Sequence, residues 1–139
     1  MSITEVSGAR NIRDISYTSQ DMRILIVDDE AANLQVLERM LKSKGHSTAT
    51  ASSAEQALQT AAKERFDLIL LDNVLPGISG MQALPRFSTI APGTPILMMT
   101  GHADEELRKD ALLLGASGFV GKPLELAALE KAIQAILGR

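Results

Sequence analysis

The sequence predicts an α/β protein in which a parallel β-sheet is covered by helices on both faces. Short aliphatic runs alternate along the chain with longer stretches in which apolar residues recur every three or four positions. The clearest runs, residues 24–27 and 68–71, are apolar at consecutive positions, as expected of strands buried on both faces. The chain has 139 residues, 45% of them hydrophobic and only 3% aromatic, which is enough for one compact domain with an aliphatic core.

The first predicted strand, residues 23–27, is followed by a helical pattern. Leucines lie three and four residues apart in it, at Leu34, Leu37 and Leu41. Gly45 ends this helix, because glycine tolerates the left-handed conformation at a helix terminus. Residues 46–51 predict a weak, threonine-rich strand, which we expect near an edge of the sheet. Ser52 or Ser53 is then placed to cap the next helix.

The second helix is indicated by its apolar positions Ala54, Ala57, Leu58 and Ala61. Residues 67–72 are the clearest buried strand of the chain. A long loop after it is marked by Pro76, Gly77 and Gly80. A third helix lies near residues 81–87, but Pro85 removes a hydrogen bond wherever it occupies a helix interior. We therefore expect that helix to be short, kinked or to begin near Leu84.

The remaining pattern completes the alternation. Residues 95–99 predict the fourth strand, residues 104–114 a helix ended by Gly115, and residues 118–121 the fifth strand. Residues 124–137 predict a closing amphipathic helix. Five strands alternating with five helices imply a parallel sheet with helices on both faces.

Residues 1–21 differ from the rest, because they are polar and carry isolated apolar residues without a sustained period. We expect a flexible N-terminal extension there, with a docking or dimerising arm as the alternative, and one domain at residues 22–139. The absence of cysteine excludes disulfides and thiolate zinc sites, and fits a cytoplasmic protein.

Charge and hydropathy exclude two kinds of direct partner for this domain. The net charge is −3 and no basic patch stands out, which argues against nucleic acid. No apolar stretch approaches the roughly 20 residues that a membrane-spanning helix needs, so we expect no membrane contact.

Residues capable of chemistry stand where the predicted strands end. They are Asp28 and Asp29 after the first strand, Asp72 at the third, Thr100 at the fourth and Lys122 after the fifth. Because the carboxyl ends of parallel strands meet at one edge of the sheet, these side chains should converge. Clustered carboxylates repel one another unless a cation is present, and an all-oxygen site suits Mg²⁺. Together with an ammonium, a hydroxyl and a nucleophilic carboxylate, they predict a phosphoryl-transfer site.

Each of these residues alone has a commoner structural explanation. An acidic pair after a strand often caps a helix, and Asp72 before a Pro-Gly loop is often a turn residue. Thr100 alone is an ordinary strand-end threonine, and Lys122 alone an ordinary solvated lysine. The combination at four strand ends favours the chemical interpretation.

At this point the sequence resembles the response-regulator receiver family of two-component signalling. The resemblance runs from about residue 22 to residue 137 and is carried by four motifs: residues 26–30 (IVDDE), 70–77 (LLDNVLPG), 99–102 (MTGH) and 118–123 (GFVGKP). It implies the flavodoxin-like doubly wound fold, a parallel sheet of five strands in the order 2-1-3-4-5 with five helices.

The resemblance also implies roles for individual residues. Asp72, four residues before the loop proline, would be the phosphoacceptor. Mg²⁺ or Mn²⁺ would be held by Asp28, acting mainly through water, and by Asp29, Asp72 and the backbone carbonyl of Val74. The phosphoryl-stabilising and switch residues would be Thr100, Gly101, Lys122 and Phe119. The Lys122–Pro123 peptide bond is expected to be cis, as is typical of the family.

The implied function is that of a phosphorylation-activated switch in a His-Asp phosphorelay. The donor would be a phosphohistidine on a sensor histidine kinase or phosphotransfer protein. The face formed by the fourth helix, fifth strand and fifth helix would then change its affinity for a downstream effector, an output domain or, in a phosphorylation-dependent homodimer, a second copy. The domain would catalyse only its own phosphorylation and dephosphorylation.

Three further expectations concern single residues. Val74 and His102 should flank the approach to the phosphoryl group and tune its lifetime, although an exposed loop histidine is the simpler explanation for His102. Lys122 should be needed for signalling but not for folding, because we expect its partner carboxylates to be solvent-accessible. Leu75 stands where the family often has methionine, which is a mild departure.

Two other functions remain as alternatives. A degenerate receiver would keep the fold and act only as a constitutive binding module, against which the complete set of site residues argues. A small flavin- or nucleotide-binding protein, or a phosphatase like the haloacid dehalogenases, is disfavoured because no glycine-rich phosphate loop follows the first strand. The sequence leaves open the cognate kinase, the output, the oligomeric state, the role of residues 1–21, and whether the chain stands alone or belongs to a longer protein.

Overall fold

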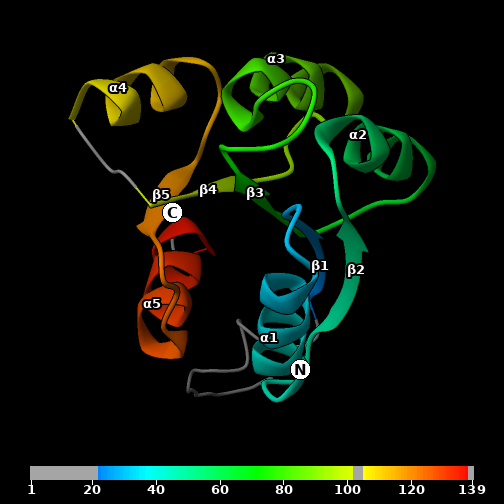
Figure 1. Ribbon diagram of the computed structural model, residues 1–139, viewed down its shortest axis with the longest axis vertical. Coiled ribbons are helices and arrows are strands. Elements are labelled where there is room, and N and C mark those ends of the chain that lie inside the picture. The colour runs from blue at the N-terminus through cyan, green and yellow to red at the C-terminus, as the bar shows by residue number, and fades with distance from the viewer. Residues whose placement is uncertain (1–21, 102–104, 138–139) are drawn as a thin grey trace, which may run out of the picture.

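Strands and helices alternate along the chain, as the sequence predicts (Figure 1). The computed structural model describes residues 22–101 and 105–137. The elements in chain order are β1 (Arg23–Val27), α1 (Ala31–Lys42), β2 (Ser47–Ala51), α2 (Ala54–Lys63), β3 (Leu68–Asp72), α3 (Gly80–Ile90), β4 (Ile96–Thr100), α4 (Glu105–Leu113), β5 (Gly118–Gly121) and α5 (Leu126–Leu137). Within those two ranges, no helix has both the length and the apolar character to cross a membrane.

The five strands form one parallel sheet in the order β2-β1-β3-β4-β5. Ile24 of β1, for example, lies between Thr48 of β2 and Leu68 of β3. The predicted flavodoxin-like order is therefore confirmed, and the threonine-rich strand β2 lies at an edge as expected. The strand order reverses between β1 and β3, where the loops that follow these two strands leave toward opposite faces and open a crevice at their carboxyl ends.

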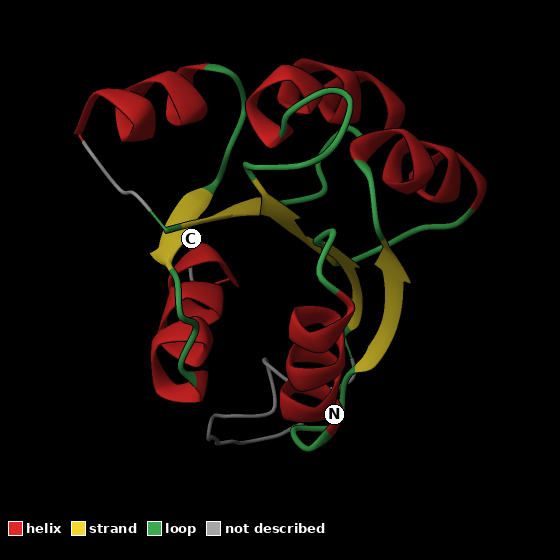
Figure 2. Cartoon of the chain, viewed as in Figure 1, coloured by secondary structure: helices red, strands yellow, loops and turns green. Residues whose placement is uncertain are grey.

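The helices cover the sheet as two layers (Figure 2). Successive strand residues point to opposite faces, so each strand supplies both layers of core. Leu25 and Val27 of β1 pack on the side of α2, α3 and α4, in a cluster that includes Phe87 of α3. Ile24 and Ile26 pack on the side of α1 and α5, against residues such as Leu129. All these side chains are fully buried, which explains why the strand segments are apolar at every position.

The expectation that the third helix is short or begins near Leu84 is wrong. Helix α3 starts at Gly80 and continues without interruption to Ile90, with Pro85 inside it. Proline removes one N–H, so the carbonyl of Met81 loses its helical partner. Pro85 lies on the exposed side of the helix, where water can satisfy that carbonyl, while Phe87 is fully buried. Packing of the apolar face therefore outweighs the lost hydrogen bond.

Helix ends agree with the sequence prediction elsewhere. The side chain of Ser53 accepts a hydrogen bond from the backbone N–H of Gln56 and caps α2. Gly45 follows α1 with φ of 93° and Gly115 follows α4 with φ of 119°, both in the left-handed region that favours glycine.

Candidate functional site

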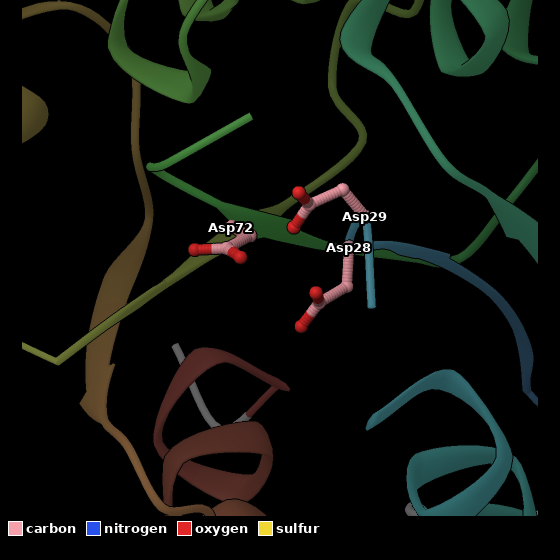
Figure 3. Close-up of side chains that lie close together, drawn as sticks. All are labelled: Asp28, Asp29 and Asp72. Carbon is pink, nitrogen blue, oxygen red and sulfur yellow. The ribbon is translucent and has the colours of Figure 1, made fainter. Parts of the chain in front are cut away.

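Three carboxylates meet at the carboxyl end of the sheet (Figure 3). Asp28 and Asp29 directly follow β1, and Asp72 is the last residue of β3. Since β1 and β3 are neighbours at the point where the strand order reverses, the side chains face one another. Each offers one carboxylate oxygen, and these oxygens lie within 4.8 Å of one another. The sequence prediction that these three residues converge agrees with this arrangement.

Two of the three carboxylates are held away from solvent. Asp28 is 0% exposed and Asp72 is 3% exposed, whereas Asp29 is exposed. One oxygen of Asp28 accepts a hydrogen bond of 3.0 Å from the backbone N–H of Glu30, and one oxygen of Asp72 accepts a 3.2 Å bond from that of Val74. Backbone donors thus orient both buried carboxylates, leaving their second oxygens to other partners.

Lys122 supplies the positive charge of the site. Its Nζ lies 2.8 Å from Oδ2 of Asp72 and 3.2 Å from Oδ2 of Asp28. It follows β5, and its backbone N–H donates a 2.7 Å hydrogen bond to the carbonyl of Thr100 at the end of β4. The Lys122–Pro123 peptide bond is cis. The lysine therefore reaches the carboxylates across two strand ends.

The pKa shifts of Asp72 and Lys122 reflect two opposing effects, burial and the interaction between the two side chains. Burial raises the pKa of Asp72 above its usual value, and the hydrogen bond and charge of Lys122 counter this only in part. Burial also opposes the charged form of Lys122. However, the hydrogen bonds and the negative charges of Asp72 and Asp28 together outweigh burial and raise the pKa of the lysine. Three carboxylates facing one ammonium leave an excess of negative charge, which a divalent cation would neutralise.

The expectation that the partners of Lys122 are solvent-accessible is wrong. Asp28 and Asp72 are both buried, and the lysine side chain itself is only 25% exposed. Strand-end aspartates were expected at the rim, but the loop after β1, the loop after β3 and the residues after β5 cover two of them. The sequence carries no signal for that cover, because it depends on how three loops meet.

The remaining predicted site residues that the structure describes differ in how they lie relative to this centre. Thr100 ends β4, beside the end of β3, and is 4% exposed, and the exposed Gly101 follows it. Val74, two residues after the phosphoacceptor candidate, is 75% exposed. Phe119 lies on β5 opposite Met98 and is partly buried against the core cluster on the α2–α3–α4 side, outside the carboxylate cluster. His102 lies outside the described residues.

A pocket of about 360 Å³ opens beside the carboxylates. Its polar wall includes Asp28, Asn33 and Lys122, and its apolar wall includes Val36 and Leu124. The amide of Asn33 donates to Asp28 at 3.4 Å and to Glu30 at 2.6 Å. The pocket therefore borders Asp28 and Lys122 between α1 and the segment that joins β5 to α5.

Two residues near the centre were not predicted. Asn73 accepts hydrogen bonds from the start of α3, and Gly80 packs directly on the backbone of Asp72. An asparagine directly after a strand is a common turn and cap residue, and that signal was available in the sequence. The close approach of Gly80 depends on how the loop closes, so only the structure shows it.

A doubly wound sheet with paired aspartates at its switch point and a lysine directly after its last strand is the arrangement of a class of phosphoacceptor domain. The chain belongs to the response regulator receiver domain family, whose model matches residues 24–134. Receiver domains of this family are the phosphorylation switches of two-component systems.

Individual relatives agree with this assignment. The transcriptional regulatory protein ZraR of Escherichia coli is 33% identical over 120 residues, which cover 84% of this chain and 27% of that protein. The chain thus spans about a quarter of the length of that curated relative. A two-component response regulator from Clostridium difficile is similar in structure, with a TM-score of 0.80, 30% identity, and coverage of 86% of this chain and 98% of that one.

One similar structure contains a metal ion. It is the receiver domain of a sensor histidine kinase from Pseudomonas aeruginosa, described with a magnesium ion coordinated in its active site cleft. It is 30% identical to this chain, with a TM-score of 0.77 and coverage of 86% of this chain and 99% of that one.

Proposed function

We propose that this chain accepts a phosphoryl group on the carboxylate of Asp72, from a phosphohistidine of a partner kinase or phosphotransfer protein, in a site that binds Mg²⁺. The observation that supports it most is the position of Asp72. Its carboxylate is buried at the switch point of the sheet, lies beside two other carboxylates, and is paired with a lysine at 2.8 Å. Those are the parts that phosphoryl transfer to a carboxylate requires.

The donor set fits Mg²⁺ or, with the same ligands, Mn²⁺. Only oxygens are offered, and the cluster carries more negative charge than its lysine neutralises. We assign Asp29, Asp72 and the backbone carbonyl of Val74 as direct ligands, with Asp28 acting mainly through water. The bound cation supplies charge that stabilises the phosphoryl oxygens during transfer.

The transfer step uses residues that already surround Asp72. One carboxylate oxygen of Asp72 forms a bond to phosphorus, and the phosphorus–nitrogen bond of the donor breaks. The histidine nitrogen leaves with the electron pair and takes up a proton. The phosphorylated carboxylate no longer carries its own charge, so the ammonium of Lys122 can pair with a phosphoryl oxygen instead. The hydroxyl of Thr100 and the N–H of Gly101 donate to the remaining oxygens.

The output follows from the position of Thr100. Its movement toward the phosphoryl group would vacate space at the end of β4, into which Phe119 of the neighbouring strand turns. The face formed by α4, β5 and α5 would then change its partner affinity, and Leu112 and Leu113 of α4 are exposed apolar residues of one of these elements. Phosphorylation biases an equilibrium between the two states only insofar as the phosphate contacts one state better.

The test is incubation of the protein with Mg²⁺ and a small phosphodonor such as acetyl phosphate, followed by intact-mass measurement. One phosphate should be added to the wild-type chain and none to Asp72→Asn, and chelation of the metal should prevent the reaction. A constitutive binding module, the alternative function, would gain no phosphate under any of these conditions. A phosphate retained in Asp72→Asn would assign the acceptor elsewhere.

A further inference from the structure

Asn73, the residue after the phosphoacceptor, bonds the start of α3 to the end of β3. Its backbone carbonyl accepts a 2.9 Å hydrogen bond from the N–H of Gly80. Its side-chain Oδ1 accepts a 3.2 Å bond from the N–H of Met81. Its own N–H donates to the carbonyl of Met99 on β4 at 3.1 Å. One half-buried residue thus connects two strands and a helix.

These bonds satisfy helix donors that would otherwise lack partners. The first N–H groups of an α-helix have no acceptor within the helix. In α3 the first two, those of Gly80 and Met81, both donate to Asn73. The third, that of Gln82, donates to the side chain of Ser79 at 3.1 Å. The helix start is therefore bonded to the residue covalently next to Asp72.

Gly80 brings the helix into direct contact with the phosphoacceptor. A Cβ atom added to Gly80 would overlap the backbone carbonyl oxygen of Asp72 and would lie 2.9 Å from Cα of Asn73. Only glycine permits this approach, because the obstructing atoms are backbone and cannot move aside. The helix start and the end of β3 are thus in backbone contact as well as hydrogen-bonded.

The loop enclosed by these contacts carries two groups of the site. Residues 74–79 leave β3 and return to α3, and the bonds of Asn73 close the loop at its base. Val74 is the first residue of the loop. Its N–H holds the carboxylate of Asp72 at 3.2 Å, and its carbonyl is the metal ligand assigned above. A change at the base of the loop moves both groups.

We infer that Asn73 is a positioning residue for metal binding and phosphoryl acceptance: by bonding α3 to β3, it fixes the Val74 carbonyl and the Asp72 carboxylate relative to each other. This inference rests on the proposed function. Asparagine suits the position because one side chain accepts from the helix while its backbone closes the loop. Metal sites depend on such outer contacts nearly as much as on their ligands.

The test compares variants that each remove one hydrogen-bond acceptor from the start of α3. They differ in whether the acceptor belongs to Asn73, at the base of the loop, or to Ser79. Asn73→Leu removes the side-chain acceptor at similar size, and Asn73→Asp keeps it. Ser79→Ala is the matched control, because it removes another cap of the same helix without touching the residue next to Asp72. Mg²⁺ affinity is measured by calorimetric titration at a temperature where circular dichroism shows every variant folded. The phosphorylation rate with acetyl phosphate is measured at saturating Mg²⁺.

Asn73→Leu should bind Mg²⁺ about tenfold more weakly, which is the lower end of the loss expected when an outer contact of a metal ligand is removed. It should also be phosphorylated more slowly. Asn73→Asp should keep the wild-type phosphorylation rate at saturating Mg²⁺. The rate is compared at saturation because the added negative charge could tighten Mg²⁺ binding, and a tighter affinity does not change a rate measured there. Ser79→Ala should lose stability but keep both properties. Where Asn73→Leu is not folded, Asn73→Ala removes the same acceptor with less apolar bulk.

Two results would overturn the inference. Wild-type Mg²⁺ affinity and rate in a destabilised Asn73→Leu would make Asn73 only a helix cap. Equal losses in Ser79→Ala would assign the effect to α3 as a whole. A wild-type chain that neither binds Mg²⁺ nor accepts phosphate would instead refute the proposed function, and the inference with it.

Discussion

Helices α3 and α4 follow the two strands that carry Asp72 and Thr100, yet they are held very differently. Helix α3 buries Gly80, Ala83, Leu84 and Phe87, and its start is hydrogen-bonded to Asn73, the residue after β3. Among the described residues of α4, only Ala111 is buried. Leu112 is 47% exposed and Leu113 is 84% exposed. The helix after Asp72 is therefore held by buried side chains and hydrogen bonds, and the helix after Thr100 would have little packing to lose in a displacement.

This difference matters for a switch, because elements that move belong to the less stable part of a fold. Under the proposed function, a rigid α3 would keep Asp72 and the loop assigned to metal binding in place. A weakly packed α4 costs little to displace, and its exposed leucines give a partner apolar surface to bury. We therefore expect signalling to change α4 and to leave α3 in place.

The largest predicted effect tests this difference in packing directly. Phe87→Ala in α3 should lower the free energy of unfolding by about 3–5 kcal/mol, because the side chain is fully buried. Leu113→Ala in α4 should change it by no more than about 0.5 kcal/mol, since that side chain is mostly exposed. Urea denaturation followed by circular dichroism measures both. Similar losses in the two variants would show that α4 is packed as firmly as α3.

The sequence predicted the sheet better than it predicted α3. Consecutive apolar residues identify buried parallel strands directly, and residues 68–72 were placed within a residue of their observed bounds. Pro85 misled the prediction for α3, because a local rule about backbone hydrogen bonding was outweighed by burial of Phe87. Long-range packing is what a single sequence shows least.

In the candidate site, too, features set by local sequence were predictable and features set by long-range packing were not. Asp28, Asp29 and Asp72 were predictable because parallel strands align their carboxyl ends at one edge. The burial of Asp28, the hydrogen bonds of Asn73 and the close packing of Gly80 were not, since each depends on how separate loops meet in space. The sequence therefore indicated which side chains could carry the chemistry. The structure was needed to show how deeply they are buried and which contacts hold them.

The second prediction concerns Lys122, which connects β5 to the acceptor region. Lys122→Ala should destabilise the metal-free protein by about 3 kcal/mol, the lower end of the cost of breaking a buried ion pair, because it leaves two buried carboxylates uncompensated. Added Mg²⁺ should restore much of this stability by supplying positive charge. Thermal melting with Mg²⁺ and with chelator measures both effects.

A second substitution serves as the control for that result. Lys122→Ala combined with Asp72→Asn removes one of the two carboxylates, so the double variant should be more stable than Lys122→Ala alone. A metal-free Lys122→Ala that melts like wild type would support the original expectation from sequence, namely that this lysine serves signalling and not folding.

The third prediction uses the raised pKa of Asp72. A raised pKa means that the folded chain binds this proton more tightly than the unfolded chain does. The contribution of Asp72 to stability is therefore complete below its usual pKa of 3.8 and is lost as pH rises through the raised value. Without Mg²⁺, Asp72→Asn should be at least as stable as wild type at neutral pH, and its advantage should shrink toward acid.

Urea denaturation at several pH values, in the presence of chelator, measures that advantage. Excess Mg²⁺ should reverse the order at neutral pH, because the cation binds the folded wild type more tightly than it binds the variant. A wild type that is clearly more stable than Asp72→Asn at neutral pH without metal would mean that the bond to Lys122 outweighs burial.

The smallest and last effect concerns the lifetime of the phosphoryl group, which we expect to depend on the loop between β3 and α3. Hydrolysis needs a water molecule in line with the phosphorus–oxygen bond, held by a positioned group. Val74 lies two residues after Asp72, is 75% exposed, and has an apolar side chain that cannot hold water by hydrogen bonding. We therefore predict that Val74 shields this approach and lengthens the lifetime.

The rate of phosphate release from purified, phosphorylated protein tests whether Val74 shields the phosphoryl group. Val74→Asn should release phosphate several-fold faster, since its amide can hold the attacking water. Val74→Ala removes the shield without adding a polar group, so it separates shielding from orientation of water and should lie between wild type and Val74→Asn. His102→Ala should alter the rate less than Val74→Asn does. Release from Val74→Asn that is unchanged or slower would refute shielding by Val74. It would leave the assignment of Asp72 intact, because that assignment rests on the buried carboxylate and its bond to Lys122.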